Sequence, residues 1–201
     1  MQIMCWVNKF ARILFCLLFC LVSAAYASAE ITQVIKVSGQ AQLRMTDSAT
    51  YQVKLMVDAG AVLYDNDKHK VGASEYVSLF QIVPSNPAHP SGLCGSGNEV
   101  WLYVYQVKSA GLVESTKVLV SSCLRSISTE SQNSGAQQQD LDFSSVRWSS
   151  AGFSIAWFEN VNVAGQSLQR SNFVPHDGGF LRQDVLIQES SNTGSLKRDE
   201  K

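Results

Sequence analysis

The 201-residue sequence predicts an all-β protein, a single-domain antiparallel β-sandwich or flattened barrel of about eight to ten strands. Apolar and polar residues alternate with period two over most of the chain after residue 30, which is typical of half-buried strands. Short connections that contain glycine separate several of these stretches. No window of about ten residues in the same part of the chain shows convincing helical periodicity. Local antiparallel pairing is therefore expected to dominate.

Two hairpins stand out among the expected strands. The stretch 99–108 is separated from 112–122 only by Ser109-Ala110-Gly111, a connection short enough to turn an antiparallel pair. Residues 146–150 and 153–158 flank Ala151-Gly152 in the same way. The other stretches with strand patterns are 31–45 (interrupted at Gly39), 51–57, 75–83, 166–173 and 180–188.

The first 29 residues have the features of a secretory signal peptide. Lys9 and Arg12 precede an apolar block at 13–22, which is too short to cross a bilayer comfortably. Ala27-Ser28-Ala29 offers a small-residue cleavage site, and a cut two residues earlier is the alternative. We expect a mature chain that begins at Glu30, has no membrane span, and is exported to the periplasm or outside the cell.

The remaining chain is expected to form one β domain, residues 30–188, followed by a flexible C-terminal tail, residues 189–201. The polar segment 128–142 is expected to form a long surface loop. Loss of Lys9 and Arg12 with the leader changes the formal net charge from −1 to −3. A nucleic-acid partner is not expected, because such proteins usually carry clustered lysine and arginine.

The cysteine count predicts one disulfide. Three of the five cysteines lie in the signal peptide, and Cys94 and Cys123 remain in the mature chain. Two cysteines in an exported protein most simply pair with each other. Closing a loop of about thirty residues stabilises a fold by roughly 3 to 4 kcal/mol on the chain-entropy model.

The segment 89–100, HPSGLCGSGNEV, combines a cysteine, a histidine and three glycines. Its stretch Gly92-Leu93-Cys94-Gly95-Ser96 resembles the G-x-C-G-[GS] nucleophile turn of viral chymotrypsin-like cysteine proteases. The resemblance covers five residues and implies a hydrolase in which Cys94 acts with His89 or His69. That family carries its histidine and acid well upstream of the cysteine, whereas Cys94 lies early in the mature chain. A disulfide would also exclude this chemistry, because a bonded sulfur is not a thiolate.

Asp65-Asn66-Asp67 is similar to the start of a calcium-binding loop, in which alternate oxygen ligands converge on the cation. The sixth position is Lys70, where the sharp turn of such a loop needs glycine. We therefore expect a polar hairpin turn between strands that end at Tyr64 and resume at Val71.

No metal site, cofactor or catalytic residue is predicted. His69, His89 and His176 are not spaced as metal ligands. The chain also lacks a serine-nucleophile motif, a phosphate-binding glycine loop and a metalloprotease motif.

The expected strand at 99–108 is apolar on both faces. Val100, Leu102 and Val104 form one row and are the better candidates for the core. Trp101, Tyr103 and Tyr105 form the opposite row, which a loop, another sheet or a partner must cover. The candidate binding residues are Trp101, Tyr103, Tyr105 and His89, the last of these in the loop tied down by the disulfide.

These observations favour an exported binding protein that is not an enzyme. The expected ligand is a protein, such as an enzyme that is inhibited, or a glycan of the cell envelope. The cysteine hydrolase is one alternative, and a structural component of an envelope or secreted assembly is another.

Overall fold

The computed structural model describes residues 32–33, 36–37 and 39–188, and it confirms an all-β, antiparallel fold. The predicted signal peptide, residues 1–29, and the predicted tail, residues 189–201, lie outside the described residues. Ten of the fourteen strands contain four or more residues. The strands are β1 (Thr32–Gln33), β2 (Lys36–Val37), β3 (Gln40–Arg44), β4 (Thr50–Lys54), β5 (Ala61–Tyr64), β6 (His69–Val71), β7 (Ser74–Pro84), β8 (Asn98–Lys108), β9 (Gly111–Ser122), β10 (Ser128–Thr129), β11 (Val146–Ser149), β12 (Gly152–Glu159), β13 (Leu168–His176) and β14 (Gly179–Leu186).

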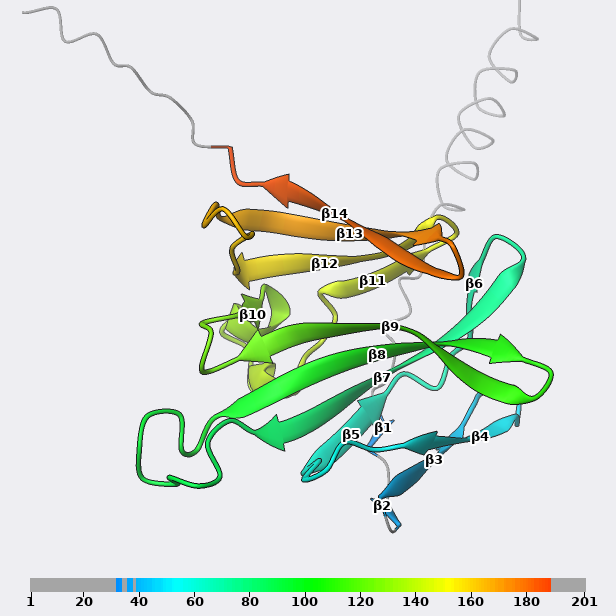
Figure 1. Ribbon diagram of the computed structural model, residues 1–201, viewed down its shortest axis with the longest axis horizontal. Helices are drawn as coiled ribbons and strands as arrows, with labels where there is room; N and C mark the ends of the chain where they lie inside the picture. Colours follow the sequence, from blue (N-terminus) through cyan, green and yellow to red (C-terminus); the bar gives the residue numbers. More distant parts are fainter. Residues whose placement is uncertain (1–31, 34–35, 38, 189–201) are drawn as a thin grey trace, which may run out of the picture.

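The strands form three sheets stacked as layers (Figure 1). The middle sheet has the order β1-β5-β7-β8-β9, with β6 paired to the other end of β7. A second sheet, β10-β12-β13-β14 with β11 beside β12, covers one face of the middle sheet. A small sheet, β2-β3-β4, covers part of the opposite face. Both predicted hairpins are present, because β8 pairs with β9 and β11 pairs with β12.

Two apolar cores hold the three layers together. The larger core lies between the middle sheet and the second sheet, and its centre includes Leu102, Ile155 and Leu168. The smaller core lies between the middle sheet and the small sheet, and it includes Leu43 and Leu79. The middle sheet therefore contributes side chains to both cores.

The strand β7 shows why the middle layer needs this sequence. Residues 76–82 are all buried, because alternate side chains enter opposite cores. A strand covered on both faces requires a continuous run of residues that tolerate burial, and a strand covered on one face requires alternation only. The run YVSLFQI satisfies this requirement with two polar exceptions, Ser78 and Gln81.

Gln81 connects the middle layer to the small sheet. Its side chain is completely buried, and its Oε1 accepts a hydrogen bond of 2.6 Å from the backbone N–H of Met56, just after β4. A backbone N–H buried without a partner costs about 1 to 3 kcal/mol, so this amide determines where the chain can leave β4.

Gln81→Ala is expected to lower the free energy of unfolding by about 2 to 3 kcal/mol, because it leaves the Met56 N–H unpaired and opens a cavity. Urea denaturation measures the change. The matched control Gln169→Ala, at an exposed position on β13, should stay within about 0.5 kcal/mol of the unmodified protein. Equal stability of the two variants would contradict the role assigned to Gln81.

Candidate functional site

The aromatic row of β8 faces the small sheet. Trp101, Tyr103 and Tyr105 contribute to the smaller core, and Val100, Leu102 and Val104 belong to the larger core. Tyr103 and Tyr105 are only 7% and 8% exposed, whereas Trp101 is half-buried. The small sheet thus covers most of the row, and Trp101 is the member that stays most accessible.

A pocket of about 320 Å³ remains where the small sheet meets β8 and β9. We call it the tyrosine pocket. Its lining combines buried apolar groups with exposed polar side chains from two layers. The lining residues are Gln52, Val53, Lys54, Leu55 and Met56 from β4 and its end, Tyr103 and Tyr105 from β8, and Leu112 and Glu114 from β9.

Tyr105 is the most strongly perturbed group of the pocket. Burial raises the pKa of its hydroxyl, and the negative charge of Glu114 and the neighbouring Tyr103 raise it further. The rings of Tyr103 and Tyr105 lie nearly parallel, at an angle of 12°, with their centroids 6.1 Å apart. Tyr105 therefore stays neutral at physiological pH and presents a hydroxyl that can both donate and accept a hydrogen bond.

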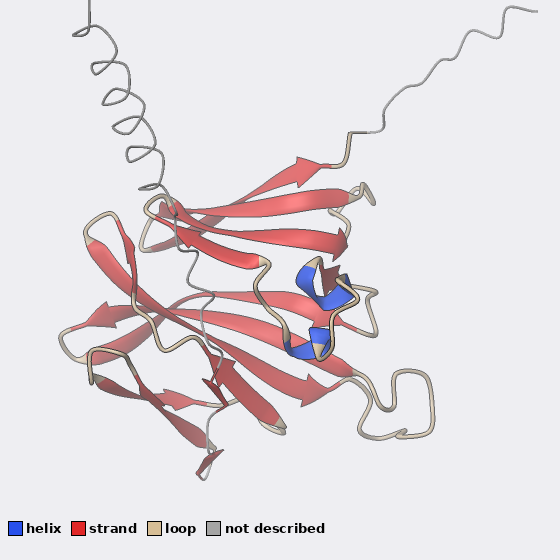
Figure 2. Cartoon of the chain, turned by 180° about the vertical axis from the view of Figure 1, so that it is seen from behind, coloured by secondary structure: helices blue, strands red, loops and turns tan. Residues whose placement is uncertain are grey.

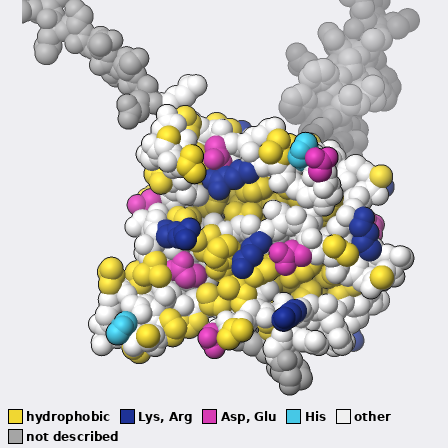
Figure 3. Space-filling view, viewed as in Figure 1, with side chains coloured by type: hydrophobic (Ala, Val, Ile, Leu, Met, Phe, Trp, Pro, Cys, Tyr) yellow, Lys and Arg dark blue, Asp and Glu magenta, His cyan; other side chains and the backbone are white. Residues whose placement is uncertain are grey.

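Lys117 lies beside the pocket, over two rings of the aromatic row. Its Nζ is 4.2 Å from the ring centroid of Trp101 and 4.8 Å from that of Tyr103, its direct neighbour across the β8–β9 ladder. These distances are those of cation–π contacts. Figure 3 shows hydrophobic side chains over β8 and β9, with single basic and acidic side chains among them. Neither sign of charge dominates this face.

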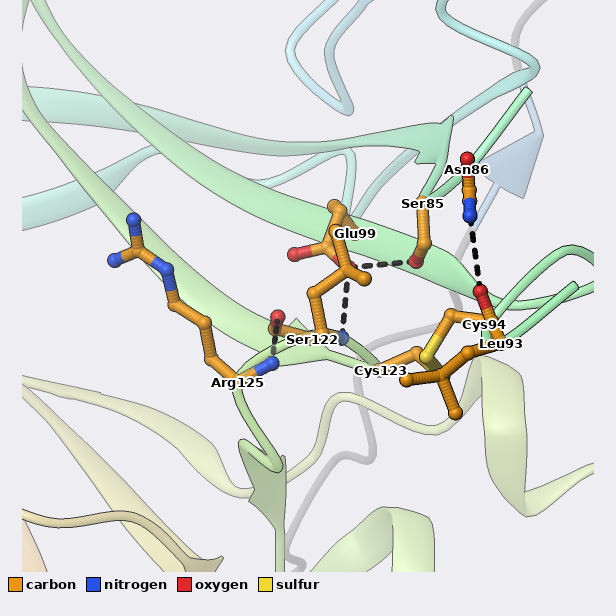
Figure 4. Close-up of a disulfide and its surroundings, with 9 residues drawn as sticks. Ser85, Asn86, Leu93, Cys94, Glu99, Ser122, Cys123 and Arg125 are labelled. Carbon is orange, nitrogen blue, oxygen red and sulfur yellow. Dashed lines mark hydrogen bonds between the residues drawn. A yellow bond between two sulfur atoms is a disulfide. The ribbon is translucent and has the colours of Figure 1, made fainter. Parts of the chain in front are cut away.

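The loop 85–97 between β7 and β8 projects beyond the ends of the strands (Figures 1 and 2). The predicted disulfide is confirmed: Cys94 in this loop is bonded to Cys123, with 5.7 Å between the Cα atoms. Two side-chain hydrogen bonds add to it (Figure 4). Ser85 Oγ donates to Glu99 Oε1 at 2.6 Å, and Asn86 Nδ2 donates to the Leu93 carbonyl at 3.0 Å.

Close packing, and not an unusual backbone angle, explains two glycines of this loop. A Cβ at Gly95 would lie 2.1 Å from the carbonyl oxygen of Pro90. A Cβ at Gly97 would lie 2.7 Å from the Cβ of Cys123. The residue with a positive φ, 55°, is Cys94 itself. These glycines therefore let the loop fold tightly against its own disulfide.

The bonded sulfur of Cys94 cannot supply the thiolate that a cysteine hydrolase requires. His89 is exposed in the loop. His69 lies on β6, where its Nε2 is 2.7 Å from Asp65 Oδ2 and its ring stacks on Trp148 at 4.3 Å. The contacts of His69 hold β6 against the second sheet.

The structure brings together three of the four predicted binding residues. Trp101, Tyr103 and Tyr105 form one row, and His89 is not part of the pocket lining. Leu112 and Glu114 were missed. The predicted connection 109–111 would pair Tyr105 with Ser115, whereas the turn of the structure is one residue shorter and puts Glu114 opposite Tyr105. The contribution of β4 had no local signal, because it depends on packing between distant segments.

Comparison with known protein families, curated proteins and solved structures gives no match. Within the described ranges, no three His, Cys, Asp or Glu side chains gather in a group that could hold a metal ion. The same part of the chain contains no helix that is long and apolar enough to cross a membrane.

Removal of the disulfide by Cys94→Ser with Cys123→Ser is expected to lower the free energy of unfolding by roughly 3 to 4 kcal/mol, because the bond closes a long loop of the unfolded chain. Denaturation in urea measures this loss. In the unmodified protein, peptide mapping after alkylation should find both cysteines unlabelled before reduction and labelled after it. Rapid alkylation of Cys94 without reduction would contradict the structural role.

Tyr105 should make the protein less stable at alkaline pH. Above about pH 10 tyrosine ionises in the unfolded chain, while the raised pKa keeps Tyr105 protonated in the folded chain. The unfolded state then binds fewer protons, so the free energy of unfolding falls as pH rises. Tyr105→Phe should reduce this fall, as measured by urea denaturation between neutral pH and about pH 11. Identical slopes for both proteins would contradict the assignment.

Proposed function

We propose that this chain is an exported, non-catalytic binding protein whose ligand occupies the tyrosine pocket and extends onto Trp101. The observation that carries the proposal is the pocket itself, a concave site with aromatic and aliphatic walls and a few polar groups. Ligand sites of proteins generally have this composition. The two layers that line the pocket give it fixed walls, because both contribute to the smaller core.

A neutral glycan of the cell envelope is the ligand class that fits best. The polar groups around the pocket are the amide of Gln52, the carboxylate of Glu114 and the ammonium groups of Lys54 and Lys117. This mixture offers both hydrogen-bond donors and acceptors, and its formal net charge is only +1 because Glu114 offsets one of the two lysines. A sugar ring presents hydroxyl groups at its rim and apolar C–H groups on its faces. The half-buried ring of Trp101 is the aromatic surface for those faces, and the exposed Lys117 side chain that lies over it has to move aside when the sugar binds.

The predicted signal peptide and the disulfide both support export. Disulfides persist in oxidising compartments, which include the bacterial periplasm and the extracellular space. An envelope glycan would be within reach of a protein in either place.

A protein partner, such as an enzyme that is inhibited, is the second candidate, and the pinned loop favours it. In the loop 85–97, which the disulfide ties to the end of β9, Leu93 is 84% exposed and His89 is exposed as well. A loop already ordered by a disulfide loses less entropy on association. This candidate uses the loop and leaves the tyrosine pocket empty.

Titration with neutral trisaccharides, namely chitotriose, cellotriose and maltotriose, tests the glycan proposal. Binding should change the tryptophan fluorescence and shift the NMR signals of Leu112 and Glu114. Glu114→Ala removes an exposed hydrogen-bonding group and should weaken binding by about tenfold. The control Glu159→Ala, an equal charge change at an exposed position on β12, should leave the affinity unchanged.

No response to any of these sugars would count against the glycan. Equal weakening by Glu114→Ala and Glu159→Ala would place the ligand outside the tyrosine pocket. Capture of an enzyme that is lost in Leu93→Ala and retained in Glu114→Ala would favour the protein partner.

A further inference from the structure

The strand β14 forms an open edge of the second sheet. It pairs with β13 only, and no other described strand lies beyond it (Figures 1 and 2). Its eight residues, GFLRQDVL, contain no proline and no lysine, and its four central residues are exposed. Proteins usually protect such edges with charged side chains (especially lysine), proline or a bulge, because unpaired N–H and C=O groups attract another strand. The two charged residues of β14, Arg182 and Asp184, have opposite signs.

The hairpin that leads into β14 determines which of its backbone groups are free. Asp177 and Gly178 form a two-residue turn with φ values of 45° and 80°, as in a type I′ turn. The residues that flank such a turn, His176 and Gly179, exchange both backbone hydrogen bonds.

Alternate residues from Gly179 onward therefore direct their backbone groups toward β13. The ladder has one register shift, between Leu168 and Arg170, which adds a residue to β13 and none to β14. Beyond it the bond of 3.0 Å from Ile187 N to the Ser167 carbonyl continues the alternation along β14. The backbone groups of the intervening residues point away from the sheet. These residues are Phe180, Arg182, Asp184 and Leu186.

We propose that two copies of this chain pair through β14, antiparallel and centred on Gln183, to form a symmetric dimer with one continuous sheet. In this register Arg182 lies opposite Asp184 of the second copy, and Asp184 lies opposite Arg182 of the second copy. Leu181 faces Val185 of the second copy, and Phe180 faces Leu186. All four residues with outward-pointing backbone groups then find hydrogen-bond partners.

Charge selects this register over its neighbours. A slide of two residues in one direction places Arg182 opposite Arg182 of the second copy, and a slide in the other direction places Asp184 opposite Asp184. Like charges directly opposite each other destabilise a strand pair, and opposite charges stabilise it. After a slide of one residue, the outward-pointing backbone groups of one copy would lie opposite residues whose backbone groups already bond to β13, and the two strands could not form a regular ladder.

Contacts within the chain already orient these two side chains. Asp184 Oδ1 lies 2.6 Å from Arg182 Nε and accepts a hydrogen bond of 2.6 Å from Ser171 Oγ. Ser171 in turn accepts a bond from Trp157 Nε1 at 2.8 Å. Arg182 and Ser171 both contact Oδ1 of Asp184. Neither of them contacts Oδ2, which can therefore accept a bond from Arg182 of the second copy.

The edge of the middle sheet at β9 does not share these properties. Its ladder with β8 is interrupted by two register shifts, and Lys117 lies in its centre. Irregularity and lysine are the usual protection of an edge. The turn after β13 also contacts β9, where Ser115 Oγ donates to the Gly178 carbonyl at 3.3 Å. Pairing through β14 is therefore the better route to a second copy.

A cysteine at the symmetry axis tests the register directly. In the proposed dimer Gln183 lies opposite itself, at about 4.5 Å between Cα atoms, a distance that a disulfide spans. Gln183→Cys, expressed with its native disulfide intact and oxidised by air, should give a covalent dimer on non-reducing electrophoresis. In the control Leu181→Cys the two new cysteines lie roughly 14 Å apart, and no such dimer should form. Equal cross-linking of both variants would overturn the register.

Charge reversal tests the interface without a covalent bond. In a dimer of Arg182→Asp, the new aspartate of each copy would lie opposite Asp184 of the second copy. In a dimer of Asp184→Arg, the new arginine of each copy would lie opposite Arg182 of the second copy. Each variant alone should therefore dimerise at least about tenfold more weakly in sedimentation equilibrium. The two variants mixed should recover a dimer, because every acid then faces an arginine. Arg170→Asp, the same change on β13 away from the edge, should dimerise like the unmodified protein.

An unmodified protein that stays monomeric at its highest soluble concentration would overturn the proposal, as would a mixture of the two variants that fails to associate. Either result would leave the free edge to another occupant, such as an extended peptide. Circular dichroism of each variant establishes that the sheets are intact before association is measured.

Discussion

The arrangement depends on one constraint, namely that the hairpin β7–β8 must be covered on both faces. Its strands carry apolar side chains on each side, so a two-layer sandwich would leave one row in water. The second sheet covers one row and the small sheet covers most of the other. The tyrosine pocket is what remains where the small sheet ends beside β9. The candidate site is therefore a consequence of how the middle layer is covered.

The disulfide connects three neighbouring strands of the middle sheet, β7, β8 and β9. Cys94 lies in the connection between β7 and β8, and Cys123 follows the end of β9. The bond ties the long loop between β7 and β8 to the end of the neighbouring strand β9. Glu99 supports the same junction, since its Oε1 accepts bonds from Ser85 and from the backbone N–H of Leu124. The loop can thus be rigid without an apolar core of its own.

The sequence predicted those features that depend on neighbouring residues. Alternating and continuous apolar patterns bounded by short turns identified the long strands and both hairpins, and counting cysteines identified the disulfide. The hairpin expected between Tyr64 and Val71 was wrong, because β5 and β6 do not pair with each other and both pair with β7. In the expected surface loop 128–142, Thr129 is buried and its hydroxyl donates to Gln132. The pairing of β5 and β6 with β7, and the burial of Thr129, depend on which segments of the chain pack together. Local periodicity contains no information about that packing.

The tyrosine pocket and the edge of β14 belong to different sheets, so a ligand at one need not disturb the other. Their combination would nevertheless have a consequence for a ligand with repeating units. A dimer joined through β14 would carry two tyrosine pockets related by a two-fold axis, and a polymeric glycan could occupy both. The second contact would then be intramolecular, and avidity can exceed the affinity of one site by roughly 10²- to 10⁴-fold. A shallow pocket that holds one sugar weakly would in this way suffice for firm attachment to a polymer.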